Sequence, residues 1–126
     1  MSRIQDISEY LSSQGLRPEP RDYGLYFRYN MLNFTIIYDD DDSEFLKINL
    51  PAIFDVNDDN LADVILACNA VNLKRKVVKA YIVDGDSVYV TAEQLLDTNP
   101  DYEDVIPRTL NMLVQARDCF YNELKG

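Results

Sequence analysis

Apolar residues along the chain follow two different spacings, which predict the order of its helices and strands. From Ile4 to Leu11 they recur every three or four positions, as expected of a short amphipathic helix. Ser2 can cap the start of this helix, and Gly15 can end it in a left-handed conformation. The prolines of segment 17–20 then favour an extended connector, because each removes a backbone donor and disfavours helix at the residue before it.

The spacing changes to two residues between Tyr23 and Leu50, and this alternation predicts three strands in a meander. Asn30 supplies a turn residue between the first two strands. The polar segment Asp39–Ser43 supplies the turn before the third strand, which Pro51 ends.

Helical spacing returns from Leu61 to Cys68 and predicts a second helix. We expect Asp58 or Asp59 to be its N-cap, and we expect it to end around residues 69–72, where two asparagines stand.

Two segments rich in β-branched residues, Val77–Val83 and Val88–Val90, lie on either side of the turn sequence Asp84-Gly85-Asp86. This arrangement is typical of an antiparallel hairpin. Asn99 and Pro100 then predict the start of the last helix, as a cap followed by a first-turn proline.

The last helix has an unusually wide apolar stripe. Its central positions are Ile106, Leu110, Leu113, Phe120 and Leu124, with Val114, Tyr121, Met112, Ala116 and Cys119 on the two flanks. Such a stripe requires cover by the sheet together with another element, or by a second copy in a homodimer. Pro107 either begins the regular part of this helix or kinks it.

The fold class predicted from this order is α+β, with an antiparallel sheet (a three-stranded meander plus a second hairpin) packed with three helices in the order α-β-β-β-α-β-β-α. The length of 126 residues suits one hydrophobic core, so we expect a single domain over residues 1–126.

Charge narrows the classes of partner. The chain has 12 Lys+Arg against 22 Asp+Glu, a formal net charge of -10, which repels phosphate backbones and anionic lipid surfaces. We therefore expect no nucleic-acid and no membrane partner. The start of the chain lacks the apolar segment of a signal peptide, which predicts a cytoplasmic protein. Cys68 and Cys119 both fall at apolar helical positions and are expected to be reduced core thiols.

Candidate catalytic chemistry is sparse. The chain contains no histidine and no glycine-rich phosphate loop, so we expect no enzyme, no cofactor and no metal. The acidic turn Asp39–Asp42 contains oxygen ligands of the kind that hard cations bind. Consecutive side chains diverge around a turn, which favours a solvated loop over a metal site.

Basic and aromatic side chains are the candidates for contact with a partner. One basic cluster follows the second helix, and tyrosines suit binding surfaces because one end is apolar and the other forms hydrogen bonds. The candidate partner-binding residues are Tyr26, Arg28, Lys74, Arg75, Lys76, Tyr89 and Tyr121.

Several segments resemble the YbjN-like family of proposed bacterial sensory transduction regulators, whose fold is similar to that of type III secretion chaperones. They are residues 25–29, 46–51, 69–72 and 78–81, the turn 84–86, and the last helix from Pro107 to Tyr121. The resemblance implies the fold of that family and transfers no catalytic residue. Asn69 and Asn72 match its most recognisable pair, which we interpret as capping and amide hydrogen-bonding groups.

The leading hypothesis is a non-enzymatic protein-interaction domain, chaperone-like or regulatory, that binds a protein or peptide segment. It would use a sheet face, a sheet edge or an exposed apolar helix flank. The alternative from another class is a small-ligand sensor or minor enzyme with a pocket between the sheet and the terminal helices.

Overall fold

The computed structural model describes residues 2–126, with the side chain of Asp40 outside the described part. These residues form three α-helices and six strands: α1 (Arg3–Ser13), β1 (Glu19–Arg21), β2 (Gly24–Tyr29), β3 (Leu32–Ile37), β4 (Phe45–Asp55), α2 (Leu61–Lys74), β5 (Val78–Val83), β6 (Ser87–Leu95) and α3 (Tyr102–Lys125). A single 3-10 turn within this range, η1 (Asp40–Asp42), precedes β4.

All strands belong to one antiparallel sheet with the order β1-β2-β3-β4-β6-β5. The predicted meander and the predicted hairpin are joined where β4 pairs with β6. The prediction that Pro51 ends the third strand is wrong, because β4 continues through Pro51 to Asp55. The α+β fold class is thus confirmed. The structure adds β1, a strand of three residues at the edge of the sheet, where the sequence predicts only an extended connector.

The two ends of α1 confirm the predicted caps. The Ser2 hydroxyl accepts a hydrogen bond from the Gln5 amide, and the Gln5 side chain accepts one from the Ser2 amide. At the other end Gly15 has φ of +81°, and the Leu16 amide donates back to the Leu11 carbonyl at 3.1 Å. This is the Schellman arrangement, which satisfies carbonyls that the helix leaves free.

The boundaries of α2 differ from the prediction. Asn60 is its N-cap, and neither Asp58 nor Asp59 takes that place. The Asn60 side chain accepts a hydrogen bond from the Asn57 amide, while its own amide donates to the Asn57 side chain. This reciprocal pair tightens the turn before α2 and so moves the start of the helix. The helix then continues to Lys74.

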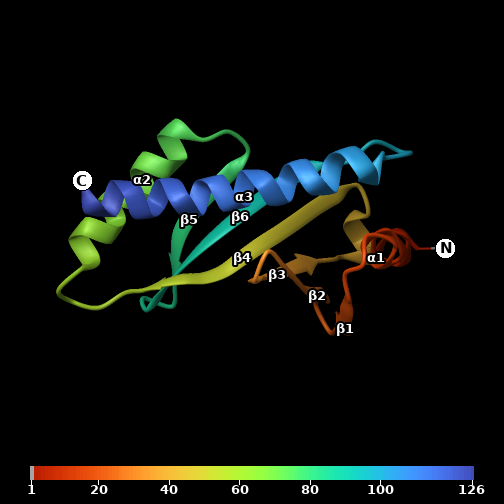
Figure 1. Ribbon diagram of the computed structural model, residues 1–126, viewed down its shortest axis with the longest axis horizontal. Helices are drawn as coiled ribbons and strands as arrows, with labels where there is room; N and C mark the ends of the chain where they lie inside the picture. Colours follow the sequence, from red (N-terminus) through yellow and green to blue (C-terminus); the bar gives the residue numbers. More distant parts are fainter. Residues whose placement is uncertain (1) are drawn as a thin grey trace.

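The start of α3 also differs. The helix begins at Tyr102, with Asp101 as its N-cap. Residues 97–101, which include the predicted cap Asn99, form the connection between the end of β6 and this helix. Pro107 does not begin the regular part of this helix, which already starts at Tyr102. It lies inside α3, which continues through it to Lys125 (Figure 1).

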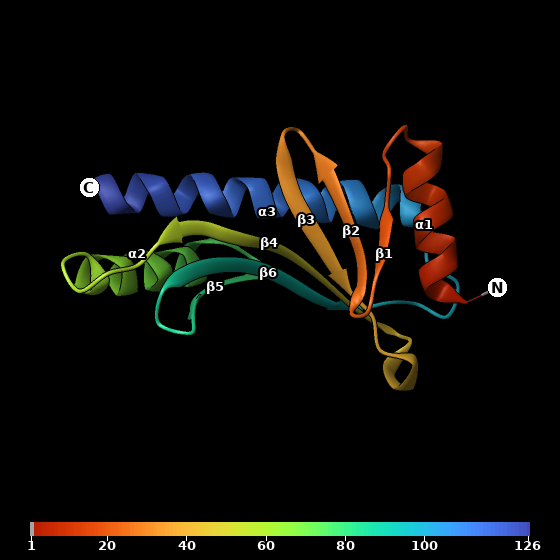
Figure 2. The same cartoon turned by 90° about the horizontal axis from the view of Figure 1, so that it is seen from below.

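One face of the sheet is covered by helices. α2 and α3 pack on it, α1 lies beside the start of α3, and in Figure 2 the strands lie in front of α3. The wide stripe of α3 is part of this core: Ile106, Leu110, Leu113, Ala116, Cys119 and Phe120 are buried, and its other members are half-buried. The chain itself therefore covers the surface that suggested a homodimer.

Candidate functional site

The opposite face of the sheet is not covered by any helix of residues 2–126 (Figures 1 and 2). Strand residues alternate between the two faces, so the partners of the buried apolar positions point outward. We call this surface the outer face.

A row of cross-strand neighbours runs over the outer face. Tyr26 pairs with Thr35, Thr35 with Asn49, Asn49 with Thr91, and Thr91 with Lys79. Members of such a row are close enough to interact directly. The row therefore links β2 to β5 across five of the six strands.

Three polar side chains near the middle of this row form a hydrogen-bonded chain. The Thr91 hydroxyl donates to Asn49 Oδ1 at 2.9 Å, so the Tyr81 hydroxyl, 2.7 Å away, donates to Thr91. Thr91 is fully buried and Asn49 nearly so, although both lie on the uncovered face. The surrounding larger side chains shield them. A buried polar network that is internally bonded fixes its members rigidly.

Aromatic rings and cations surround this network. The ring centroids of Tyr81 and Tyr89 are 6.2 Å apart. Lys79 lies over Tyr81 at 5.6 Å from the ring centroid, and Arg21 lies over Tyr26 at 5.2 Å. The Tyr81 hydroxyl is bonded to Thr91, and the Tyr26 hydroxyl donates to Asn33 Oδ1 at 2.7 Å. Tyrosine is enriched at protein interfaces because it joins an apolar ring to a hydrogen-bonding group.

The outer face is nearly neutral although the chain is strongly acidic. Its described strand side chains comprise four cations, Arg21, Arg28, Lys47 and Lys79, and three carboxylates, Glu19, Asp55 and Glu93. Four minus three is +1, against -10 for the whole chain. This face is therefore the part of the sheet least repulsive to an acidic or neutral segment.

An ion pair on the outer face raises the pKa of one lysine. Lys79 pairs with Glu93, and this hydrogen bond raises the pKa of Lys79 above its ordinary value. The pair contacts the polar network through the Lys79–Tyr81 stacking.

Both free edges of the sheet are protected against further strands. β1 has only three residues, all exposed, and contains Pro20. On β5, the Ala80 amide donates to Asn72 Oδ1 at 2.7 Å, and Asn72 Nδ2 donates to the Ala80 carbonyl at 3.1 Å. The amide of Asn72, a residue of α2, thus occupies the place that a neighbouring strand would take.

The candidate residues named from the sequence lie in three separate places. Tyr26, Arg28 and Tyr89 share the outer face. Tyr121 lies on α3 and is a structural residue, because its hydroxyl donates to the Ile53 carbonyl and Arg117 stacks on its ring at 4.8 Å. The basic cluster occupies the helical side of the molecule.

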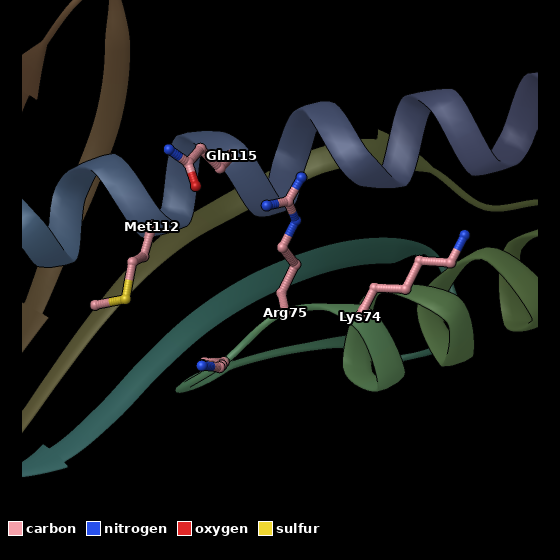
Figure 3. A pocket seen from close by; sticks show the side chains of 5 residues that line it. Lys74, Arg75, Met112 and Gln115 are labelled. Carbon is pink, nitrogen blue, oxygen red and sulfur yellow. The ribbon is translucent and has the colours of Figure 1, made fainter.

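The basic cluster lines a shallow hollow between the end of α2 and α3. The hollow has a volume of about 290 Å³ and is lined by Lys74, Arg75, Lys76, Met112 and Gln115 (Figure 3). Arg75 extends toward α3, while Lys74 forms an ion pair with Glu123 that raises the Lys74 pKa. No carboxylate of the described residues pairs with Arg75 or Lys76.

The site residues that the sequence analysis missed are Asn49, Thr91, Tyr81 and Lys79. Part of the pattern that could have identified them is present in the sequence, since polar residues alternate with apolar ones in both β4 and β6. What was missing was the register, which alone places Asn49 opposite Thr91.

Neither the acidic turn Asp39–Asp42 nor the two cysteines show the geometry of a metal-binding or nucleophilic site among the described residues. The Asp39 carboxylate accepts a hydrogen bond from the Asp41 amide, and within the described part no three His, Cys, Asp or Glu residues are grouped as metal ligands. Both cysteines are free and buried, and burial raises the pKa of the Cys68 thiol to about 11. A thiol with so high a pKa is a poor nucleophile.

No helix among residues 2–126 combines the length and apolar character needed to cross a bilayer.

The antiparallel sheet with helices on one face defines the class of this protein as a two-layer α+β domain. No protein-family model matches the chain, and no curated protein matches it. The solved structures that resemble it include the following two. YbjN from E. coli, a proposed transcription regulator, has a TM-score of 0.72 at 14% identity, covering 93% of this chain and 87% of its own. An uncharacterised protein from Methanothermobacter thermautotrophicus has a TM-score of 0.67 at 16% identity, covering 98% and 96%. The chain therefore has a YbjN-like fold.

Proposed function

We propose that this chain is a non-enzymatic protein-interaction domain, chaperone-like or regulatory, that binds an extended segment of a partner protein on its outer face. The observation that carries the proposal is the nearly neutral, tyrosine-bearing outer face on a chain of charge -10. The description of YbjN as a proposed transcription regulator agrees with a regulatory role.

The protected edges favour the face over the edges as the binding surface. A peptide that added a strand to β5 would have to displace the two hydrogen bonds between Asn72 and Ala80. On the outer face, a segment lying across the strands would meet Tyr26, Tyr89 and Arg28 without displacing any backbone pairing. We place this activity in the cytoplasm, where two free thiols persist.

The test begins with affinity purification from the native host and continues with the purified partner. Calorimetry would compare the original chain with the double variant Arg28→Glu/Lys47→Glu and with Tyr89→Ser. A matched control, Arg108→Glu/Lys125→Glu, makes the same charge change on exposed residues of α3. We expect the outer-face variants to weaken binding about tenfold or more and the control to bind normally. Equal binding by all variants would overturn the proposal.

The alternative of a small-ligand sensor depends on a pocket between the sheet and the terminal helices. A hollow does lie there, lined by residues of α1, α3 and β2 that include Tyr10, Tyr29 and Ile106. Its volume of about 190 Å³ is below the roughly 300 Å³ typical of ligand pockets, whereas a second hollow, between α1 and the strands β1 and β2, has a volume of about 360 Å³. A thermal-shift screen with metabolites and cations tests this alternative, because a ligand that binds the folded chain raises its melting temperature.

A further inference from the structure

We infer that the hollow between the end of α2 and α3 binds the phosphate group of a small phosphate monoester. We call this hollow the basic hollow; it is lined by Lys74, Arg75, Lys76, Met112 and Gln115 (Figure 3). The inference is independent of partner binding on the outer face, because the basic hollow lies on the helical side of the sheet.

The basic hollow has an excess of positive charge in a strongly acidic chain. Its lining includes three cations and no carboxylate, although the whole chain has 22 Asp+Glu against 12 Lys+Arg. Glu123 on α3 pairs with Lys74 and so neutralises one of the three cations. Arg75 and Lys76 belong to no ion pair of the described residues. A phosphate monoester carries about 1.5 to 2 negative charges at neutral pH, which matches the two cations that remain.

A second hollow shows that unpaired cations alone do not make such a site. Beside β1, a hollow of about 360 Å³ also contains two cations, Arg17 and Arg28, but Glu19 lines it as well. A carboxylate within the lining repels an anion and competes with it for the cations. The basic hollow has no such competitor in its lining.

The end of α2 does not account for all the cations of the basic hollow. Positive side chains are favourable at the C-terminus of a helix, and Lys74 takes that place in the last turn. The side chain of Arg75 instead extends toward α3, the helix that contributes Gln115 (Figure 3). Its guanidinium is therefore available to a ligand in the hollow.

The lining side chains provide the donors that a phosphate group requires. The planar guanidinium of Arg75 can donate two parallel hydrogen bonds to a pair of phosphate oxygens. The ammonium of Lys76 and the side-chain amide of Gln115 are further donors. Met112 gives the hollow an apolar wall, against which the carbon atoms of a monoester can pack. A monoester should therefore bind more tightly than inorganic phosphate.

The size of the basic hollow favours a small ligand. Its volume of about 290 Å³ is close to the lower limit of roughly 300 Å³ for ligand pockets. This space accommodates a phosphate group with a few carbon atoms. A nucleic acid would instead bring a row of phosphates against a chain of net charge -10.

The backbone holds the two unpaired cations in place. Val77 has φ of +73°, a left-handed conformation that β-branched residues rarely adopt. Such strain persists where the surrounding structure fixes it, and it is concentrated at functional sites. The Arg75 amide donates to the Val71 carbonyl at 2.9 Å on one side, and β5 begins at Val78 on the other. Segment 75–77 is thus fixed at both ends, which reduces the entropy lost when an anion binds.

Calorimetry with glycerol 3-phosphate as the probe tests the inference. At low ionic strength we expect one molecule bound per chain, with a dissociation constant of about 0.1–1 mM because the cations are exposed and screened by salt. Inorganic phosphate should bind more weakly. Arg75→Gln/Lys76→Gln should weaken binding of the monoester about tenfold or more.

The matched control is Arg17→Gln/Lys125→Gln. It also removes two exposed cations that form no ion pair among the described residues, but neither lines the basic hollow. The control should bind the monoester like the original chain, and thermal melts should show both double variants folded. Absence of binding to the original chain, or an equal loss in the two double variants, would overturn the inference.

The pH dependence of binding is a test that needs no variant. A phosphate monoester loses its second proton at a pH of about 6, so its negative charge increases between pH 5.5 and 7.5. The charged groups that face the basic hollow are Lys74, Arg75, Lys76 and Glu123, and the chain has no histidine. Binding of the monoester should therefore tighten several-fold over this interval, whereas binding of sulfate, a dianion throughout, should not. Monoester binding that is no tighter at pH 7.5 would contradict the proposal.

A phosphorylated peptide is the other source of the same chemical group. Because the hollow is small, the residues beside a phosphoserine would extend outside it and add few contacts. Free phosphoserine and a peptide containing phosphoserine should therefore bind with similar affinity in the same calorimetric titration. A peptide that binds about tenfold more tightly than the free amino acid would show that the hollow recognises a modified protein, and would overturn the assignment to a small molecule.

Discussion

The side chain of Asn72 joins α2 to the free edge of β5 through its two hydrogen bonds to Ala80. Asn69, one turn earlier on α2, is exposed and does not take part in this contact. The two asparagines are therefore not equivalent, although the sequence pattern treats them as a pair. The interpretation of Asn72 as an amide hydrogen-bonding group is confirmed by this geometry, whereas its partner could not be named without the tertiary structure.

We predict that Asn72→Ala lowers the free energy of unfolding by about 1–3 kcal/mol, because it leaves the amide and carbonyl of Ala80 without their partners. Urea unfolding measures this change. Asn111→Ala, at an exposed position of α3, is the control and should change stability by less than about 0.5 kcal/mol. Equal effects of the two substitutions would show that the contact with β5 contributes little.

Met31 offers a second prediction at this scale. It occupies the second position of the two-residue turn between β2 and β3, with φ of +64°, after Asn30 with φ of +51°. Turns of this kind favour glycine, because a Cβ is strained in the left-handed region. Met31→Gly should raise the free energy of unfolding by about 1 kcal/mol. Thermal melts of both variants measure this change. Met31→Ala keeps the Cβ and should show no such gain.

At the scale of elements, the apolar spacing predicts most helices and strands, and the errors have local causes. Two capping predictions failed, at Asp58 or Asp59 and at Asn99, because several residues in a row could cap a helix and the path of the chain decided between them. The strand β1 was missed because three exposed residues with a central proline have no alternating pattern. Pairing with β2 alone makes them a strand.

The position of Pro107 inside α3 leads to a third prediction. A proline there cannot donate the hydrogen bond that the Glu103 carbonyl would otherwise accept, and its ring crowds that carbonyl. Because Pro107 is exposed, its replacement leaves no cavity. Pro107→Ala should therefore raise the free energy of unfolding by about 1–2 kcal/mol. Arg108→Ala, the adjacent exposed position, is the control, and a loss of stability in Pro107→Ala would contradict the argument.

At the scale of the whole molecule, the resolved pKa shifts all have the same sign. The pKa values of Tyr10, Cys68, Lys74 and Lys79 are raised by folding, through burial for the first two and through ion-pair hydrogen bonds for the lysines. The folded chain thus keeps these protons to higher pH than the unfolded chain does. Their contribution to stability is complete below the unfolded pKa values and is lost as pH rises through the folded ones.

We therefore predict that the free energy of unfolding falls between pH 8 and pH 10.5, measured by urea titration. The thiol begins to contribute to the fall above its unfolded pKa of about 8.5, and the lysines above about 10.4. Cys68→Ala removes the group whose folded pKa is about 11. The free energy of unfolding of this variant should therefore fall less over the same pH interval than that of the original chain. A fall of the same size in Cys68→Ala would show that Cys68 does not contribute.

The outer face illustrates the limit of sequence analysis for the site. Tyr26, Arg28 and Tyr89 could be named as binding candidates from residue type alone, and all lie on the uncovered face. Tyr121 is of the same residue type, yet it packs on the helical side and bonds to Ile53. Residue type does not distinguish these cases, because exposure depends on what packs against each strand and helix.

The sequence by itself determined the fold class, the strand alternation and the caps of α1, because these depend on the spacing of residues close together in the chain. Only the tertiary structure decided that β4 pairs with β6 and that the chain itself covers the stripe of α3. These outcomes depend on contacts between segments far apart in sequence. A local pattern shows that an apolar side needs a partner and does not show which partner covers it.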